Sequence, residues 1–426
     1  MTSIFTNPSR DAWEALCERP SARNHEVRER VEAILEKVRT RGDEALMELA
    51  AEIEGRPLKN LEVTGAEIQE AREKVSPAVK KAIGQAFDHI RAFHETQQPR
   101  EICLETAPGV KCIQRPVPIE NVGLYIPGGS APLFSSVLML AVPALIAGCP
   151  HRILCTPAGK DGKVSPEVLY AASLCQVGRI FKLGGAQAVA AMAYGTRTVP
   201  RVDKIFGPGN QYVTTAKQLL SAGTVAIDMP AGPSEVMVIA DETTSPAFAA
   251  ADLLSQAEHG PDSQVMLLCK SLSVCEAILK EVDRQAALLP RSAVALQALE
   301  GSRAIIFAKR QDCIDFANCY APEHLIISTL DPWSIADQIT AAGSIFVGPY
   351  TPESAGDYAS GTNHTLPTSG WARSFSGVNL DSFYRKMTLQ EISREGLEGL
   401  RDTIVDMARA EGLQAHANAV ILRTHA

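Results

Sequence analysis

From about Val110 onward, short apolar runs alternate with helical segments, and this alternation constrains the fold more than any other feature. Each run has the length of a buried strand and is followed by a segment with helical periodicity. The candidate strands are Val122–Ile126, Arg152–Cys155, Arg179–Leu183, Lys204–Phe206, Val225–Ile227, Val236–Ile239, Val265–Leu268, Ala304–Phe307, Leu325–Ile327 and Ser344–Val347. Such alternation predicts parallel sheets covered by helices. These strands are more than one sheet comfortably holds, so we expect two doubly wound α/β units.

Helical periodicity fills the segments between the strands and extends toward both ends of the chain. The helices expected between strands are 165–176, 186–194, 210–221, 245–258, 273–288 and 333–341. Residues 24–55 keep a 3.6-residue apolar period that Gly42 interrupts, and Ser76-Pro77 is typical of a helix start. Residues 348–377 are rich in Gly, Ser, Thr and Pro, which predicts a long loop, and the chain from Thr388 onward is expected to be amphipathic helix.

Charge and hydropathy exclude two classes of partner. The chain has 426 residues, a formal net charge of −8 and no block of five or more Lys or Arg, which argues against nucleic-acid binding. The apolar-rich stretch 131–150 is interrupted by Ser135, Ser136 and Pro143, so we expect a buried helix and not a membrane span. Residues 1–10 lack the apolar run of a signal peptide. The sequence therefore favours a soluble, cytoplasmic protein.

The ten cysteines do not form a metal-binding or disulfide pattern. No C-x-x-C spacing occurs, and most of the cysteines lie in apolar runs, where Cys behaves as a small hydrophobe. We therefore expect buried, reduced thiols, and any bound zinc would have to be held by nitrogen and oxygen ligands.

Three Gly-rich turns follow candidate strands and open helices: Tyr125–Ser130, Leu183–Gln187 and Gly207–Asn210. Glycines at such a turn let the backbone approach phosphate groups at a helix N-terminus. The third turn lacks the last glycine of a dinucleotide fingerprint and has Tyr212 there, so a plain strand-to-helix turn explains it as well. Together the three turns would line one crevice at the carboxyl ends of parallel strands.

Several polar side chains are spaced for chemistry, although each has a simpler explanation. Gln256 and His259 are three residues apart at the end of a helix and could share a metal ion, but such pairs are usually solvated helix ends. Glu323 and His324 are adjacent and could divide two proton-transfer tasks, or could serve a turn only. Asp357 lies in a polar loop where turn formation is its more common role.

Two long segments carry a family resemblance. The run Ile227–Glu235 and the run Asp252–Pro261 closely resemble the signature of histidinol dehydrogenase, the NAD-linked zinc enzyme that completes histidine biosynthesis. The resemblance extends from the turn Ile126–Pro132 to the C-terminal run that begins at Ala415, with no departure at any mapped position.

The resemblance implies a set of site residues. The zinc ligands would be Gln256, His259, Asp357 and His416. The substrate would contact these four residues and also Ser234, His324, His364 and Glu411. Glu323 and His324 would be the catalytic residues, and Tyr125, Gln187 and Asn210 would contact NAD.

The activity implied is the oxidation of L-histidinol through L-histidinaldehyde to L-histidine with two NAD⁺. One zinc ion per subunit would chiefly anchor the substrate, because a ligand set with a single negative charge leaves the ion open to the imidazole and amine of histidinol. The family forms homodimers with shared active sites. The competing hypothesis is a zinc-dependent hydrolase on an α/β scaffold, although no hydrolase signature occurs and the three Gly-rich turns would stay unexplained.

The expected domains follow from the alternation and the resemblance together. Residues 1–118 with 234–375 are expected to form a first α/β domain on the substrate and zinc side, with a helical N-terminal arm. Residues 119–233 would form a second α/β domain on the NAD side. Residues 376–426 would form a small helical segment that reaches the partner subunit. The fold class is α/β, with two incomplete Rossmann-like parallel sheets.

Overall fold

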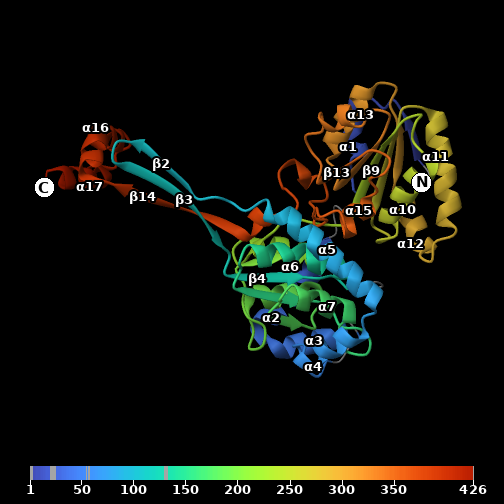
Figure 1. Cartoon of the computed structure of the whole chain (residues 1–426), viewed down its shortest axis with the longest axis horizontal. Helices are drawn as coiled ribbons and strands as arrows, with labels where there is room; N and C mark the ends of the chain where they lie inside the picture. Colours follow the sequence, from blue (N-terminus) through green and yellow to red (C-terminus); the bar gives the residue numbers. More distant parts are fainter. Residues whose placement is uncertain (1–2, 20–24, 54, 56–57, 129–132, 426) are drawn as a thin grey trace.

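Two lobes and a narrow arm make up the protein (Figure 1). The computed structural model describes residues 3–19, 25–53, 55, 58–128 and 133–425. Each lobe contains a parallel sheet, and the arm projects away from both lobes with the C-terminus at its tip. Part of the turn Tyr125–Ser130, and of the run Ile126–Pro132, falls outside the described residues.

The first lobe contains a six-stranded sheet in the order β1-β11-β10-β9-β12-β13, and all its strand pairs are parallel. Its strands are β1 Ser3–Thr6, β9 Glu235–Ala240, β10 Gln264–Cys269, β11 Arg303–Ile306, β12 His324–Ser328 and β13 Ser344–Val347. Helices α10 Pro246–Ala257, α11 Leu272–Ala286 and α12 Ser292–Glu300 contribute to the core on one face. Helices α1 Trp13–Leu16, α13 Arg310–Tyr320 and α14 Trp333–Ala336 contribute to the core on the other.

The second lobe contains a five-stranded parallel sheet in the order β6-β5-β4-β7-β8. Its strands are β4 Asn121–Tyr125, β5 His151–Cys155, β6 Arg179–Phe181, β7 Lys204–Phe206 and β8 Ala226–Ile227. One face packs on α5 Pro77–Glu95, α6 Phe134–Ile146 and α7 Pro166–Leu174, with α4 Gly65–Lys74 beside α7. The other packs on α2 His25–Arg41, α3 Asp43–Glu52, α8 Gly185–Tyr194 and α9 Gln211–Ser221.

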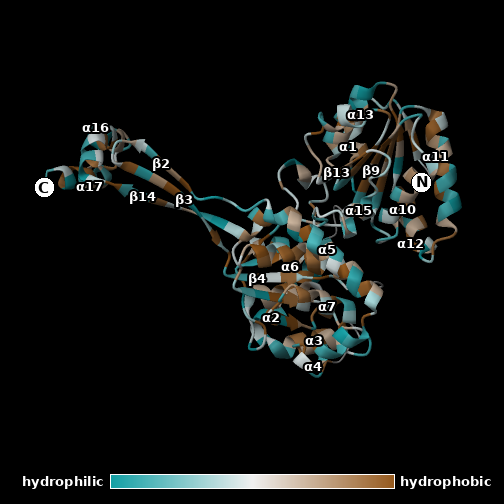
Figure 2. Ribbon diagram, in the orientation of Figure 1, coloured by the Kyte–Doolittle hydropathy of each residue, from teal (hydrophilic) through white to brown (hydrophobic). Residues whose placement is uncertain are grey.

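Burial explains the apolar runs of both sheets. Every residue of β9 and of β10 is buried, as expected for strands covered on both faces. The apolar stretch expected to be a buried helix is α6, whose core-facing residues lie under α5 and α7. Figure 2 shows hydrophobic residues concentrated in the sheets and in α6, with hydrophilic residues on the outer helices. None of the described helices combines the length and hydropathy needed to cross a bilayer.

The arm is a three-stranded antiparallel sheet capped by two helices. Strands β2 Ile102–Ala107, β3 Val110–Pro118 and β14 Tyr384–Ile392 pair in the order β14-β3-β2. Helices α16 Arg394–Ala410 and α17 Gln414–Thr424 pack on each other at its tip. The expectation of helix from Thr388 onward is wrong up to Ile392, because this segment pairs with β3 instead. The described residues also include one further short helix and three 3₁₀ turns: α15 Glu353–Tyr358, η1 Arg10–Ala12, η2 Trp371–Arg373 and η3 Leu380–Phe383.

The fold class expected from the sequence is confirmed, with two doubly wound parallel sheets. All the candidate strands are present, with ends shifted by a few residues. The expected domain boundaries stay a prediction. The packing of α2 and α3 against α8 and α9 favours placing residues 25–95 with the second lobe instead of the first.

Candidate active site

The candidate site lies at the amino edge of the six-stranded sheet. Glu235 begins β9 and His324 begins β12, and these two strands are neighbours in register. Helix α10 runs back from the carboxyl end of β9, so its last turn brings Gln256 to the same edge, and His259 follows just after the helix end. Helix α15 adds Asp357. Ligands of open α/β sheets usually bind at the carboxyl edge, so this position is unusual for the fold.

Glu323 and His324 form a buried acid–imidazole pair. Nδ1 of His324 lies 3.5 Å from Oε2 of Glu323 and 3.1 Å from the carbonyl oxygen of Glu235. A carbonyl oxygen only accepts, so Nδ1 carries a hydrogen, and Nε2 is the nitrogen that holds the lone pair when the ring is neutral. Nε2 is buried without a hydrogen-bond partner among the described residues. The pair therefore presents one basic nitrogen to the site.

The charges around the pair shift both pKa values. Burial raises the pKa of Glu323. Burial alone would lower the pKa of His324, but the carboxyls of Glu323, Glu353 and Asp357 outweigh it and raise that pKa to about 10. Burial also raises the pKa of Glu353, to about 8. Such crowding of buried acids around one imidazole is typical of a functional site.

Three of the four expected metal ligands converge within the chain. Ligand atoms of His259, Glu353 and Asp357 lie within 4.8 Å of one another. The side-chain amide of Gln256 lies beside them; with its oxygen facing the N–H of Glu235 at 3.0 Å, its nitrogen donates to the carboxyl of Glu353. Imidazole, carboxylate and amide donors fit a borderline cation such as zinc.

His364 and Ser234 lie at the border of this cluster. Nδ1 of His364 donates to the carbonyl oxygen of Asp357 at 3.0 Å, and its Nε2 lies 3.1 Å from Oγ of Ser136. His364 therefore connects the cluster to α6 of the second lobe. Ser234 immediately precedes β9, and its carbonyl accepts from the N–H of Gln264.

Glu411 and His416 are not brought to this cluster by the fold of one chain. Glu411 is the C-cap residue that follows α16, and His416 lies in the first turn of α17; both are exposed, and these helices form the tip of the arm (Figure 1). The arm carries them away from both lobes. A complete set of expected ligands in one site therefore requires an arm from a second chain.

The expected cofactor residues lie at the carboxyl edge of the five-stranded sheet. The hydroxyl of Tyr125, at the end of β4, accepts from the N–H of Gly185 at 3.0 Å. Gln187 is buried in the first turn of the same helix, α8. Asn210 caps α9, where its side chain accepts from the N–H groups of Tyr212 and Val213.

A buried ion pair holds the turn after β7. Nζ of Lys217 donates to the carboxyl of Asp228 and to the carbonyl of Gly207, and the N–H of Gly207 donates to Asp228 at 2.8 Å. Gly207 has φ of +125°, and an added Cβ would lie 2.1 Å from the carbonyl oxygen of Tyr125. Only glycine fits this crossing between two of the expected cofactor turns.

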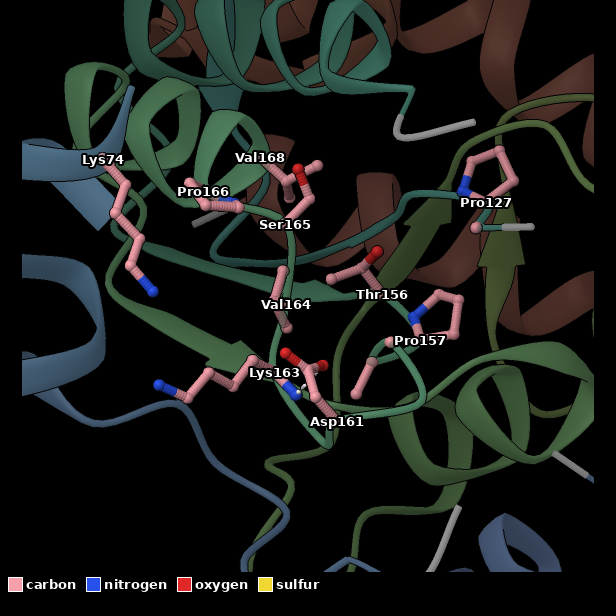
Figure 3. A pocket seen from close by; sticks show the side chains of 13 residues that line it. Lys74, Pro127, Thr156, Pro157, Asp161, Lys163, Val164, Ser165, Pro166 and Val168 are labelled. Carbon is pink, nitrogen blue, oxygen red and sulfur yellow. Dashed lines mark hydrogen bonds between the residues drawn. The ribbon is translucent and has the colours of Figure 1, made fainter. Parts of the chain in front are cut away.

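A cavity of about 330 Å³ adjoins the same edge (Figure 3). Pro127 and Gly128 after β4, and Thr156 and Pro157 after β5, contribute to its wall. Lys74 and Lys163 extend from its other side in Figure 3. Neighbouring strand ends thus open onto a space large enough for part of a small cofactor.

One buried acid of the site was missed by sequence reasoning. Glu353 is 1 % exposed and accepts from Oγ of Ser255 at 3.2 Å. Its oxygen Oε1 lies 3.9 Å from Nδ1 of His324. The signal was its spacing of four residues from Asp357, which puts both carboxyls on one helical face.

The two-lobed fold and the buried acid–imidazole pair define an α/β enzyme with acid–base chemistry at its centre. The family model for histidinol dehydrogenase matches residues 17–424. The chain is 52% identical to the histidinol dehydrogenase of Bacteroides thetaiotaomicron over 99% of both chains. It is 53% identical to that of Xylella fastidiosa over 93% of both. The crystal structure of histidinol dehydrogenase from Elizabethkingia anophelis superposes with a TM-score of 0.95 at 48% identity, over 99% of this chain and 97% of that one.

The chain belongs to the histidinol dehydrogenase family. It is therefore an oxidoreductase of histidine biosynthesis, as the resemblance implied, and the hydrolase alternative is set aside.

Proposed function

We propose that this chain oxidises L-histidinol to L-histidine in two successive steps at one site, reducing two NAD⁺. The observation that carries the proposal is the buried pair of Glu323 and His324 beside the converging donors of Gln256, His259 and Asp357. Glu323 and His324 are an acid and a base suited to both steps. Gln256, His259 and Asp357 suit a zinc ion that would bind the imidazole and the amine of the substrate.

Gln256, His259 and Asp357, together with His416 of the partner subunit, would hold one zinc ion. The donor set fits the ion, because it offers imidazole, carboxylate and amide groups from a site that is open at His259. Bound zinc would anchor the amine and imidazole of histidinol and offset the negative charge of Asp357, which favours the neutral form of His324.

His324 takes the hydroxyl proton of histidinol on Nε2. Bound NAD⁺ would supply the oxidising chemistry by accepting the hydride from the same carbon. In the second step Glu323 takes a proton from water as the water oxygen adds to the aldehyde carbon. Once His324 has released the first proton to solvent, it takes a hydroxyl proton of the hydrate, and a second NAD⁺ would accept the hydride from that carbon. Ser234, His364 and the partner's Glu411 hold polar atoms of the substrate.

NAD would bind at the carboxyl edge of the five-stranded sheet, with contacts from Tyr125, Gln187 and Asn210. The cavity beside this edge and the glycine crossing at Gly207 support this position. His364 contacts both α6 of this lobe and Asp357 of the other, so it lies between the expected cofactor residues and the expected substrate residues.

The working form would be a homodimer in the cytoplasm. Exposed apolar side chains on the arm support a partner surface, since Ile102, Leu104, Met407 and Leu422 are all more than half exposed. The free thiols of all ten cysteines fit a reducing compartment.

The test follows absorbance at 340 nm while a known amount of L-histidinol is consumed with excess NAD⁺. We expect two NADH per histidinol, because one acid–base pair serves both oxidations without release of the aldehyde. A carbonyl reagent that traps aldehyde in near-stoichiometric yield, with one NADH per histidinol, would contradict the single-site proposal.

A further inference from the structure

Glu235 connects to the catalytic pair through its backbone. Its N–H donates to Oε2 of Glu323 at 2.8 Å, and its carbonyl oxygen accepts from Nδ1 of His324 at 3.1 Å. The same carbonyl decides which nitrogen of His324 carries the hydrogen, and therefore which nitrogen is the base. A shift of this peptide would move both catalytic side chains at once.

The side chain of Glu235 forms a buried ion pair with Arg19. Its carboxyl is 2 % exposed and accepts two hydrogen bonds from Arg19, from Nε at 3.0 Å and from the terminal nitrogen at 3.2 Å. It also accepts from the N–H of Ser369 at 2.7 Å. A fork of two parallel hydrogen bonds fixes direction as well as distance.

Arg19 makes further contacts besides Glu235, and it also lines a cavity of about 540 Å³. Its guanidinium donates to the carbonyls of Cys17 and Tyr320 at 2.9 and 2.8 Å. It also stacks over the ring of Tyr320, with its central carbon 3.8 Å from the ring centre. The phenol of Tyr320 donates to Gln264, which begins the neighbouring strand β10. Arg19 is thus a rigid support, although it touches none of the expected substrate or cofactor residues.

We propose that Arg19 and Glu235 are positioning residues, which fix the peptide of residue 235 so that Glu323 and the free nitrogen of His324 face the substrate. The proposal rests on the proposed function of Glu323 and His324. It adds two residues, on the far side of β9 from the substrate, on which the rate of both oxidation steps depends. Replacing a residue that orients a metal ligand through a hydrogen bond typically lowers activity about 10- to 100-fold, and we expect an effect of this size for residues that orient a catalytic pair.

The test replaces Arg19 by Ala and measures kcat and KM separately for histidinol and for NAD⁺. We expect kcat to fall about 10- to 100-fold while both KM values stay within about threefold, because orientation is lost and binding groups are kept. Millimolar guanidinium should restore kcat by occupying the vacated site, and sodium chloride at the same ionic strength should not. Rates are expressed per folded dimer, measured by sedimentation.

Arg179→Ala is the matched control. Arg179 makes the same two-bond contact with Glu62, at 2.7 and 2.6 Å, on the five-stranded sheet. The kcat of the Arg179→Ala variant should equal that of the parent enzyme, with or without guanidinium. If Arg19→Ala does not fold, Arg19→Lys keeps the charge but loses the fork, and its kcat should still fall.

A kcat per folded dimer equal to that of the parent enzyme would overturn the proposal, as would a loss that guanidinium does not reverse. If Arg19→Lys has to be used instead, a kcat equal to that of the parent enzyme would overturn the proposal. The activity of the parent enzyme distinguishes a failure of the proposed function from a failure of the positioning role of Arg19 and Glu235. If it forms no NADH from histidinol, the proposed function has failed, whereas positioning fails only where the parent enzyme is active.

Discussion

His324 presents two different nitrogens to two different surroundings. Nδ1 is committed to a backbone carbonyl, and Nε2 is buried with no partner among the residues that the structure describes. A buried polar atom without a partner is costly, and a catalytic role is one of the explanations for such an atom. We expect the hydroxyl of the substrate to bind at this nitrogen.

Glu323→Gln tests the division of labour within the pair. We expect oxidation of the aldehyde to fall about 100- to 1000-fold, because the amide cannot take a proton from water. Oxidation of the alcohol should fall less than about tenfold, because His324 keeps its contact with Glu235. Single-turnover measurements with histidinol and with histidinaldehyde separate the steps. Equal losses in both steps would rule out the assigned roles.

We expect His94 to make the stability of the second lobe depend on pH. The side chain is fully buried on α5, and its Nδ1 contacts the carbonyl of Ile90 at 2.8 Å. Burial lowers the pKa of His94. Because the unfolded chain takes up a proton near pH 6.5 and the folded chain does so only at lower pH, stability is full above that value and falls with acidification, by at most about 1.4 kcal/mol per pH unit.

The measurement compares unfolding temperatures at pH 7.5 and pH 5.5. His94→Leu should show a smaller difference between the two pH values than the parent protein. Ile90→Val disturbs the same packing without removing a titrating group, so it should keep the parent difference. If His94→Leu and the parent protein show the same difference in unfolding temperature between the two pH values, His94 does not cause the pH dependence of stability.

At the scale of elements, the sequence predicted best where strands are covered on both faces. Every residue of strands β9 and β10 is buried. Both strands are therefore apolar runs in the sequence, and these runs were enough to predict them. The arm strands were missed because β2 and β14 have mostly exposed residues and no core-facing period. Strand β14 pairs with a strand far away in the sequence, and no local pattern encodes such a partner.

The candidate site shows the same limit. The family resemblance implied which side chains carry chemistry, but not that Glu353 and the ion pair of Arg19 with Glu235 lie beside them. These contacts join segments that are distant along the chain, so they follow from topology and not from spacing. The placement at the amino edge of the sheet also follows from the return of α10, which the helix length alone did not reveal.

Asp228→Asn tests the turn between β7 and α9. Both side chains of the pair with Lys217 are almost fully buried, with 1% of Asp228 and 3% of Lys217 exposed. Removing the carboxylate leaves a buried ammonium without its counter-charge, so we expect a loss of about 3–5 kcal/mol in unfolding free energy. The turn should also loosen and raise the KM for NAD⁺.

Thermal unfolding and a titration with NAD⁺ measure the two effects. Glu398→Gln is the control, because its ion pair with Arg394 is exposed on the arm and contributes little. An unfolding temperature of Asp228→Asn equal to that of this control would contradict the prediction.

At the scale of the whole molecule, the arm separates His416 from the other expected ligands. If each site takes its body from one chain and its arm from the other, two inactive variants can complement each other. His324→Ala and His416→Ala are mixed, unfolded and refolded together. About half of the dimers are then mixed, each with one intact site of two, so activity should approach roughly a quarter of the parent value.

The control refolds each variant alone, and mass spectrometry confirms that mixed dimers have formed. Activity no higher than that of the separate variants, with mixed dimers present, would mean that each site is built within one chain.

The order of strands also sets the order in which a newly made chain can fold on the ribosome. The five-stranded sheet uses residues 121–227 without interruption, so it can close while later residues are still being added. Strand β1, in contrast, pairs with β11 at residues 303–306. At roughly 5–20 residues per second, the first strand waits on the order of 15 to 60 seconds for its partner. The arm waits longer still, because β14 is among the last segments to emerge, and the catalytic lobe therefore matures before the segment that would complete a neighbour's site.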